Sequence, residues 1–277
     1  MVYCVESPPQ GEFFEFEESV FGESFDHWTQ AQIDAEMRAN DWYDRSAARY
    51  LDQLEQAKPG GRRLLEIGAS FGPFIQRAQQ RGWDAEGVDA SAHAVEAGQK
   101  HFNTAVILGT EAAVADRPPH DAVVGLDVIE HQIEPRAFLR RLRPLVRPGG
   151  VLLLKTPNHD CLYARLYGPM AMANRIVRRV TGRSLPWASM YYNYEPGQRL
   201  QSGHAIHFSR QTLRRALELE GFEIVLDAPE YSDIEYLLSR RPDRSLLTTI
   251  GLRLVDGIAR LTKSPNKVVM VGRRVAD

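Results

Sequence analysis

The feature that most constrains the fold is a regular alternation of short apolar runs with helical segments over residues 62–157. Strands that alternate with helices form βαβ units with right-handed crossovers, and such units build a parallel sheet. The sequence therefore predicts an α/β fold. The five apolar runs are RRLLEIG (62–68), DAEGVD (84–89), TAVIL (104–108), DAVVGLDVI (121–129) and VLLLKT (151–156).

The segments on either side of this alternation predict the remaining organisation of the chain. Residues 1–60 form a helical N-terminal extension, with a helix at about 28–57 that breaks near 40–41. The remainder, 61–277, is a single domain with further strands at 222–228 and 267–274 and a helix-rich stretch at 233–262. Residues 158–206 far exceed a usual connection of about 2–6 residues, so we expect a substrate lid containing a basic helix near 170–180.

Local signals place several helix ends. Pro73 opens the helix after the first run, in a position where its missing N–H costs nothing. Ser91 and Ser209 are expected N-caps, because their side chains accept a hydrogen bond from the first turn. The sequence Pro148–Gly149–Gly150 is expected to close the preceding helix before the strand at 151–156.

Composition excludes several other classes of protein. Among 277 residues, 34 are basic and 36 acidic, so no overall positive field exists to hold nucleic acid. Cys4 and Cys161 are far apart, which excludes a disulfide framework and a self-contained cysteine zinc site. We find neither the pattern of a signal peptide nor an apolar run of about 18 residues, and we expect a cytoplasmic protein without a membrane partner.

The chemistry begins at the end of the first predicted strand, with the loop Glu66–Ile67–Gly68–Ala69–Ser70–Phe71–Gly72. Ligands of parallel sheets bind beyond the carboxyl ends of the strands. Gly68 permits a tight turn, and we expect backbone N–H groups of 68–72 to face a ligand. Read as G-x-G-x-x-G, however, the loop has Ser70 and Pro73 in place of the second and third glycines, so it fails the dinucleotide pattern.

Two acidic residues indicate the chemistry of the ligand that this loop would hold. Glu66 would repel a pyrophosphate but suits an ammonium group. Asp89 ends the second run, where an acid accepts the hydroxyl groups of a ribose. Together they favour a cationic, phosphate-free ligand with a ribose, and S-adenosylmethionine has an amino group, a ribose and a sulfonium.

These segments make the chain resemble class I S-adenosylmethionine-dependent methyltransferases, in particular the small-molecule branch that includes ubiquinone-biosynthesis O-methyltransferases. The resemblance covers about 43–228. It depends on four segments in the right order, of which LDVIEHQIEPRAFLRRLRPLVRPGGVLLLKTPN is the most specific. The other three are LLEIGASFG, GWDAEGVDAS and HFSRQTLRRALELEGFEIV. The family implies a Rossmann-like, seven-stranded, mostly parallel sheet whose last strand is antiparallel.

The resemblance also implies roles for residues of this chain toward S-adenosylmethionine. Glu66, Gly68 and Gly72 would hold the methionine end, together with Ala69, Ser70 and Phe71 of the same loop. Asp89 would hold the ribose, Ala90 would lie beside the adenine, and Thr110 and Glu111 would lie near its polar edge. Asp127 would lie near the sulfonium. Ser70 and Thr110 depart from the family pattern, which usually has a glycine and an acid at these positions.

Methyl transfer by direct displacement mainly requires that two reactants be aligned, and a hydroxyl acceptor also requires a general base. His131 is the candidate for this base, and its alternative role is to fix the loop by hydrogen bonds together with Glu130. Tyr191 and Tyr192 of the lid are expected to bind the acceptor, or else to pack the lid on the core. His204 and His207 flank the return of the lid and are also expected to bind the acceptor, with docking of the next helix as the alternative role of His207. A metal site at Asp127, Glu130 and His131 is a further alternative, but we expect none.

The sequence thus predicts a methyltransferase that uses S-adenosylmethionine and acts on a small-molecule acceptor, at a hydroxyl oxygen. The alternatives are N-methylation of an amino sugar or similar amine, a nicotinamide dehydrogenase, and a cofactor-binding protein without turnover. The basic stretch of the lid, which includes Arg175, Arg178, Arg179 and Arg183, is either a solvated face or a surface for an acidic partner. Nucleic acid is not an expected partner, and a homodimer is compatible with the sequence.

Overall fold

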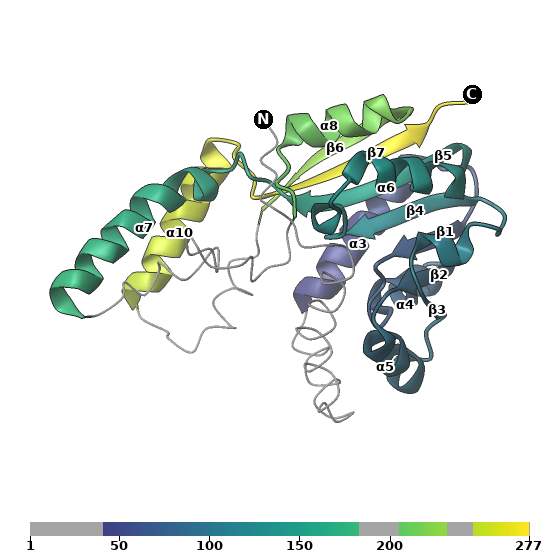
Figure 1. The fold of residues 1–277 in the computed structure, drawn as a ribbon, viewed down its shortest axis with the longest axis horizontal. Coiled ribbons are helices and arrows are strands. Elements are labelled where there is room, and N and C mark those ends of the chain that lie inside the picture. The colour runs from purple at the N-terminus through teal and green to yellow at the C-terminus, as the bar shows by residue number, and fades with distance from the viewer. Residues whose placement is uncertain (1–40, 183–204, 232–245, 277) are drawn as a thin grey trace.

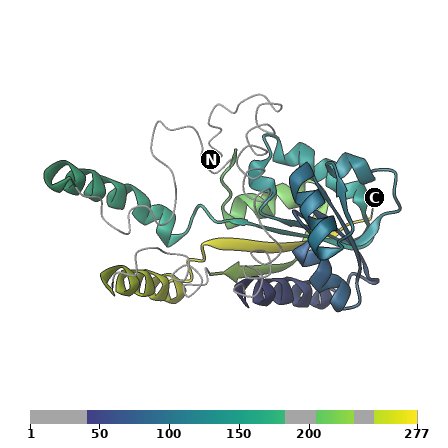
Figure 2. The ribbon, with the colours of Figure 1, turned by 90° about the horizontal axis from the view of Figure 1, so that it is seen from below.

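The computed structural model describes residues 41–182, 205–231 and 246–276, and within them one seven-stranded sheet carries helices on both faces (Figures 1 and 2). The strand order is β3-β2-β1-β4-β5-β7-β6. The strands are β1 (Arg63–Ile67), β2 (Asp84–Asp89), β3 (Val106–Leu108), β4 (His120–Leu126), β5 (Val146–Pro157), β6 (Phe222–Glu230) and β7 (Lys267–Arg274).

The direction of the strands agrees with the predicted sheet. The five strands β3, β2, β1, β4 and β5 are parallel, and β7 inserts antiparallel between β5 and β6. The prediction of a mostly parallel sheet with an antiparallel last strand is therefore confirmed. Because β2 lies on one side of β1 and β4 on the other, the chain order reverses at β1, and a ligand site is expected beyond the carboxyl ends of β1 and β4.

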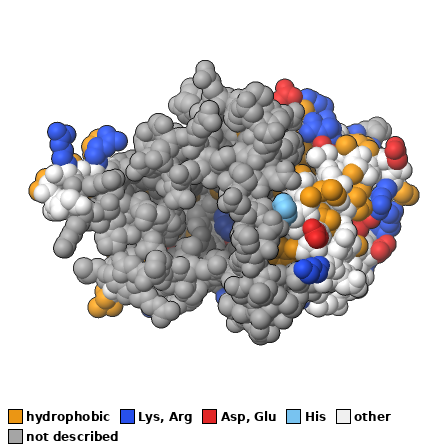
Figure 3. Space-filling view, turned by 60° about the horizontal axis from the view of Figure 1, so that its bottom comes forward, with side chains coloured by type: hydrophobic (Ala, Val, Ile, Leu, Met, Phe, Trp, Pro, Cys, Tyr) orange, Lys and Arg blue, Asp and Glu red, His pale blue; other side chains and the backbone are white. Residues whose placement is uncertain are grey.

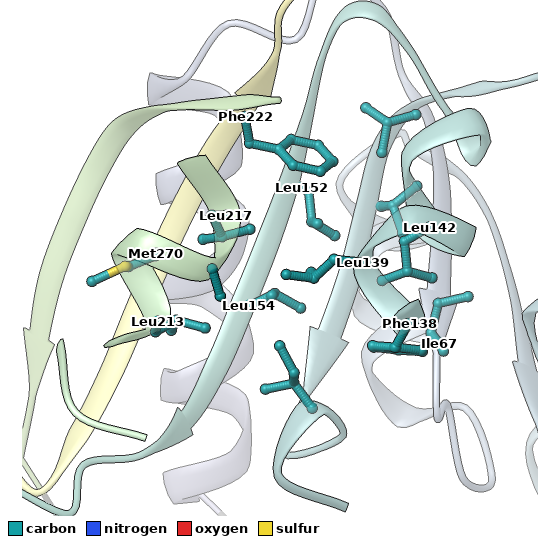
Figure 4. Packing of buried hydrophobic residues seen from close by; sticks show 14 of the residues in the cluster. Ile67, Phe138, Leu139, Leu142, Leu152, Leu154, Leu213, Leu217, Phe222 and Met270 are labelled. Carbon is teal, nitrogen blue, oxygen red and sulfur yellow. The ribbon is translucent and has the colours of Figure 1, made fainter. Parts of the chain in front are cut away.

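Two hydrophobic clusters lie on opposite faces of the sheet, because successive residues of a strand point to opposite sides. On β5, Leu152 and Leu154 pack with helices α6 (Pro135–Leu142) and α8 (Arg210–Leu219) in the cluster that Figure 4 shows. Leu153 faces the other way, into the cluster that contains α3 (Asp41–Gln56) and α4 (Pro73–Gln80). Helix α5 (Ala92–Phe102) contributes Val95 to this second cluster.

Two further helices, α7 (Leu162–Thr181) and α10 (Leu246–Leu261), extend beyond one end of the sheet (Figures 1 and 2). Their bases meet where buried Cys161 packs with Ala259, and the backbone N–H of Leu162 donates to Ser264 Oγ at 2.6 Å. The basic helix expected at 170–180 thus exists, but it is longer and begins at Leu162. Among the described helices none is both long and apolar enough to cross a membrane.

Several predicted boundaries are confirmed and others need correction. Pro73 opens α4, and Ser91 and Ser209 accept hydrogen bonds from the N–H groups of Ala94 and Thr212, as expected of N-caps. The prediction that 148–150 closes a helix is wrong, because α6 ends at Leu142 and β5 already begins at Val146, which pairs with His120. Of the predicted N-terminal extension, α3 and its C-terminal turn lie within the described residues.

Candidate active site

A cavity of about 290 Å³ opens at the carboxyl ends of β1, β4 and β5, where the strand order predicts a site. The loop between β1 and α4 forms one wall, and helix α3 forms another. The lining residues are Ser46, Ala47, Tyr50, Glu66, Gly68, Ala69, Ser70, Phe71, Pro73, Phe74, Leu126, Asp127 and Lys155. The cavity therefore gathers Glu66, the loop and Asp127, which the sequence had assigned to one ligand.

The loop keeps its shape through three residues in the left-handed backbone region. Gly68 and Gly72 have φ of 71° and 82°, and Ser70, which stands where the family usually has glycine, has φ of 51°. A Cβ on Gly68 would lie 2.6 Å from Val128 Cγ2, so no larger residue fits there without a shift. Gly68 is thus required both by its conformation and by the space around it.

The expectation that the N–H groups of this loop face a ligand is wrong for four of the five residues. The N–H groups of Gly68 and Ala69 both donate to the carbonyl oxygen of Val88, at 2.9 and 3.0 Å. The N–H of Ser70 donates to Asp89 Oδ2 at 2.6 Å, and that of Gly72 to the carbonyl oxygen of Ala69 at 2.9 Å. These four N–H groups therefore stabilise the loop itself, and the loop contributes to the cavity mainly through its shape.

Glu66 is the least satisfied polar group of the cavity. Its side chain is buried, with the residue 3% exposed, and Oε2 has no hydrogen-bond partner among the described residues. Burial, together with the charge of Asp89, raises the pKa of Glu66 well above its ordinary value. A buried carboxyl without a partner costs free energy, which a cationic ligand with N–H donors would recover.

Asp89 is held firmly by the backbone at the end of β2. Its Oδ2 accepts from the N–H of Ser70 at 2.6 Å and its Oδ1 from the N–H of Ser91 at 2.8 Å. Burial raises the pKa of Asp89, although these two hydrogen bonds oppose the shift. Each carboxylate oxygen has a second lone pair, so the fixed side chain retains the capacity to accept hydroxyl donors.

Asp127 and Lys155 form an ion pair on the opposite side of the cavity. The Lys155 Nζ donates to Asp127 Oδ2, and the backbone N–H of Asp127 donates to the Lys155 carbonyl oxygen at 2.9 Å. Lys155 is 4% exposed. Burial lowers the pKa of Lys155, but the charge of Asp127, its hydrogen bond and the charges of Glu230 and Glu130 together outweigh burial and raise that pKa. Asp127 also has a positive φ, of 56°.

Further charged groups lie next to this pair, with Glu130 in the short helix after β4 and the others on neighbouring strands. Glu130 is 1% exposed and accepts from Thr156 Oγ1 at 2.9 Å, and burial and the charge of Asp127 raise the pKa of Glu130 to about 8. Burial and the neighbouring charge of Lys155 lower the pKa of Lys267 to about 8. We call Asp127, Glu130, Lys155, Glu230 and Lys267 the strand-end charge cluster.

Helix α3 is connected to the same cluster. The Tyr50 hydroxyl donates to Glu230 Oε2 at 2.8 Å, and both residues are buried. Burial, the charge of Glu230 and this hydrogen bond raise the pKa of Tyr50. The segment that the sequence placed in an N-terminal extension therefore supplies a wall of the cavity and is fixed to β6.

The residues expected around the adenine are described but have other contacts. Thr110 caps the 3₁₀ helix η1 (Glu111–Val114), its hydroxyl accepting from the N–H of Ala112. The carboxylate of Glu111 is paired with Arg141 Nε. Ala90 is exposed, next to Asp89. Their roles toward an adenine stay predictions.

No histidine is among the described residues that line the cavity. His131 ends the 3₁₀ helix η2 (Ile129–His131) directly after β4 and is half-buried. The rings of His159 and His207 meet edge to face, with centroids 4.1 Å apart. Burial and the charge of His159 lower the pKa of His207 to about 4.

The remaining predicted residues are divided between described and undescribed parts of the chain. Tyr191, Tyr192 and His204 lie outside the described residues, as does Arg183. Basic side chains gather at the far end of α7 (Figure 3), where Arg175 and Arg179 are exposed. Within the described residues, no group of three or more His, Cys, Asp or Glu side chains is arranged to hold a metal ion.

The sequence analysis missed the lining residues of α3 and Lys155. Lys155 was visible as one charge inside the apolar run VLLLKT, a pattern that signals a buried cation with a partner. Tyr50 gave no such signal, because a tyrosine on the apolar face of a helix is an ordinary core residue.

The fold and the site define a protein of the α/β class with a cavity at the switch point of its sheet. The chain belongs to the methyltransferase domain family, which matches residues 37–226. The predictions of a class I methyltransferase and of its fold are confirmed at this level.

Two comparisons with curated relatives support the same assignment. A ubiquinone biosynthesis O-methyltransferase of Alkalilimnicola ehrlichii is 31% identical over 119 residues, which are 40% of this chain and 48% of the relative. Another, of Leptothrix cholodnii, is 31% identical over 121 residues, which are 40% of this chain and 51% of the relative. The chain thus spans about half the length of the curated relatives it matches.

Solved structures agree in fold. A 1,6-didemethyltoxoflavin-N1-methyltransferase of Burkholderia thailandensis superposes with a TM-score of 0.54 at 15% identity, covering 99% of this chain and 95% of that one. A SAM-dependent methyltransferase of Archaeoglobus fulgidus gives a TM-score of 0.51 at 17% identity, covering 95% and 99%. At these identities the likeness concerns the fold alone.

Proposed function

We propose that this methyltransferase uses S-adenosylmethionine and methylates a hydroxyl oxygen of a small-molecule acceptor. One observation carries the proposal: Glu66, which lines the cavity, has a buried carboxylate oxygen with no partner among the described residues, and Asp89 accepts from the N–H of Ser70 in the same lining. An ammonium group would satisfy Glu66, and ribose hydroxyls suit the remaining lone pairs of Asp89. S-adenosylmethionine supplies both groups and an already activated methyl group on its sulfonium.

Oxygen is favoured as the acceptor atom because the curated relatives are named as O-methyltransferases. A hydroxyl must lose its proton as it is methylated, and we assign this step to His131, which ends the short helix that follows β4 and lies four residues after the lining residue Asp127. His207 would contact the acceptor from the lid, where its lowered pKa of about 4 keeps the ring neutral near pH 7. Tyr191, Tyr192 and His204 are proposed to complete the acceptor site.

The cofactor assignment is tested by isothermal titration calorimetry with S-adenosylhomocysteine and with NADH. We expect binding of S-adenosylhomocysteine and none of NADH, and tight NADH binding alone would contradict the proposal. Asp89→Ala should abolish measurable binding, since it removes the ribose acceptor and the partner of two backbone N–H groups. The matched control is Asp84→Ala at the exposed start of β2, which should bind as the wild type does. Unchanged binding by Asp89→Ala would refute the ribose assignment.

The base assignment is tested by His131→Ala once a screen of hydroxyl and amine acceptors has found a substrate. Turnover should fall by about 10²–10⁴-fold, with the affinity for S-adenosylhomocysteine unchanged within about twofold. His93→Ala on α5 serves as the control histidine. Full activity of His131→Ala would leave His131 a merely structural residue. NMR of the product tells O-methylation from N-methylation of an amine.

A further inference from the structure

We infer that Lys155 binds the carboxylate of the cofactor's methionine end, a role that depends on the proposed function. The observation is a match of charges in the cavity. Its lining includes two carboxylates, Glu66 and Asp127, and one ammonium, Lys155. The methionine end of S-adenosylmethionine carries the complementary set, which is two cations and one carboxylate.

Four of the five backbone donors of the loop are already occupied. The N–H groups of Gly68, Ala69, Ser70 and Gly72 all have acceptors within the loop or on β2. Among the described residues that line the cavity, Lys155 has the one cationic side chain. A carboxylate that enters next to Glu66 would be buried beside a like charge, which is costly unless a cation pairs with it.

Lys155 meets the requirements for this task. An ammonium group has three N–H donors, and Asp127 Oδ2 accepts from one of them. Its raised pKa keeps the group charged over the physiological range. Lys267 lies behind it, on the strand β7 that pairs with β5, and adds positive potential at the same edge.

Charge-assisted hydrogen bonds of this kind typically change affinity by about 10- to 100-fold. The test compares two ligands that differ in a single group: S-adenosylmethionine and its decarboxylated form, which keeps the ammonium and the sulfonium. Calorimetry should show that the wild-type protein prefers S-adenosylmethionine by about that factor. Lys155→Met should reduce the preference to less than about threefold, by weakening the binding of S-adenosylmethionine.

The matched control is Lys267→Met, which removes an equally charged side chain from the neighbouring strand and from outside the described cavity lining. It should keep most of the preference. A preference that survives in Lys155→Met, or an equal loss in affinity for both ligands, would overturn the inference while leaving the proposed function intact. Failure of the wild-type protein to bind S-adenosylmethionine would instead refute the proposed function.

Loss of the ion pair with Asp127 could prevent Lys155→Met from folding, which far-UV circular dichroism would reveal. The same ratio is then measured for the double variant Lys155→Gln with Asp127→Asn, in which two neutral amides replace the pair. This variant also lacks the cation, so it should show the same loss of preference, and a retained preference would overturn the inference.

Discussion

The two sides of the cavity differ in whether their buried charges are paired. At the ends of β1 and β2, burial raises the pKa of both Glu66 and Asp89, the charge of Asp89 raises that of Glu66 further, and Glu66 Oε2 has no partner among the described residues. At the ends of β4, β5, β7 and β6, the strand-end charge cluster alternates acids and lysines, and the ion pair of Asp127 and Lys155 lies at the cavity.

This difference indicates which side is incomplete without a ligand. Breaking a buried pair leaves an uncompensated charge, whereas a complete pair is nearly neutral toward stability. The β1–β2 side therefore has free energy to gain from a cation, whereas the charges of Asp127 and Lys155 on the β4–β6 side already compensate each other. Four substitutions test whether the first side is set by loop shape and the second by charge.

The largest effect is expected from Gly68→Ala on the loop side. Its φ of 71° costs a residue with a Cβ about 1–2 kcal/mol, and the clash with Val128 adds about 1–3 kcal/mol. The free energy of unfolding in urea should thus fall by about 2–5 kcal/mol. Gly82→Ala is the control, because its φ is 81° but no atom lies within 4 Å of the added Cβ. Equal losses in the two variants would show that space around Gly68 is not restricted.

On the charged side, Tyr50→Phe removes the hydrogen bond that fixes α3 to Glu230. Hydrogen bonds to charged groups contribute about 1.5–3 kcal/mol, and the loss should appear in urea unfolding. Arg49→Met provides the comparison, since its 3.6 Å contact with the same carboxylate comes from a side chain that is 50% exposed and should be worth less than about 1 kcal/mol. If the two variants lose the same stability, the Tyr50 bond is not the anchor of α3.

Glu130→Gln tests the pH dependence of the charge cluster. The pKa of Glu130 is raised from 4.5 to about 8, by burial and by Asp127, so between these pH values the folded state binds more protons than the unfolded state. The free energy of unfolding of the wild-type protein should therefore fall as pH rises through this window. The variant lacks this loss, so its free energy of unfolding should rise relative to that of the wild type between pH 5 and pH 8.

The control for this measurement is Glu96→Gln, which replaces an exposed carboxyl on α5 and should follow the wild-type curve. A constant difference between Glu130→Gln and the wild type from pH 5 to pH 8 would contradict a raised pKa of Glu130.

The loop side of the site was largely predictable from the sequence, because its signals are local. Gly68, Pro73 and Ser91 act within a few residues of their own positions, and each has the predicted role in a turn or helix start. Asp89 follows Glu66 by one βα unit, and parallel strands bring both ends to the same edge. Only the direction of the loop N–H groups was wrong, since their acceptors on β2 depend on how that strand pairs.

The charge cluster was not predictable in the same way. Glu230 and Lys267 face each other because β7 runs antiparallel between β5 and β6, and this order appears only in the assembled sheet. Tyr50 reaches Glu230 across 180 residues of sequence. Such contacts leave no local pattern, although a lysine within the apolar run of β5 indicates that some acid must lie close to it.

The smallest effect is expected from Ser70→Gly. This variant distinguishes the contribution of the backbone conformation at this position from that of the serine hydroxyl. Ser70 has φ of 51°, which costs a residue with a Cβ about 1–2 kcal/mol, so glycine would remove this strain. The greater entropy of glycine in the unfolded chain opposes this gain by about 0.5–1 kcal/mol. The variant should therefore be more stable in urea by up to about 1 kcal/mol, with the N–H bond to Asp89 retained. Asn103→Gly, at φ of 50° after α5, should gain less, because asparagine tolerates this conformation well. A loss of stability in Ser70→Gly would mean that the serine hydroxyl, rather than the backbone alone, supports the loop side of the cavity.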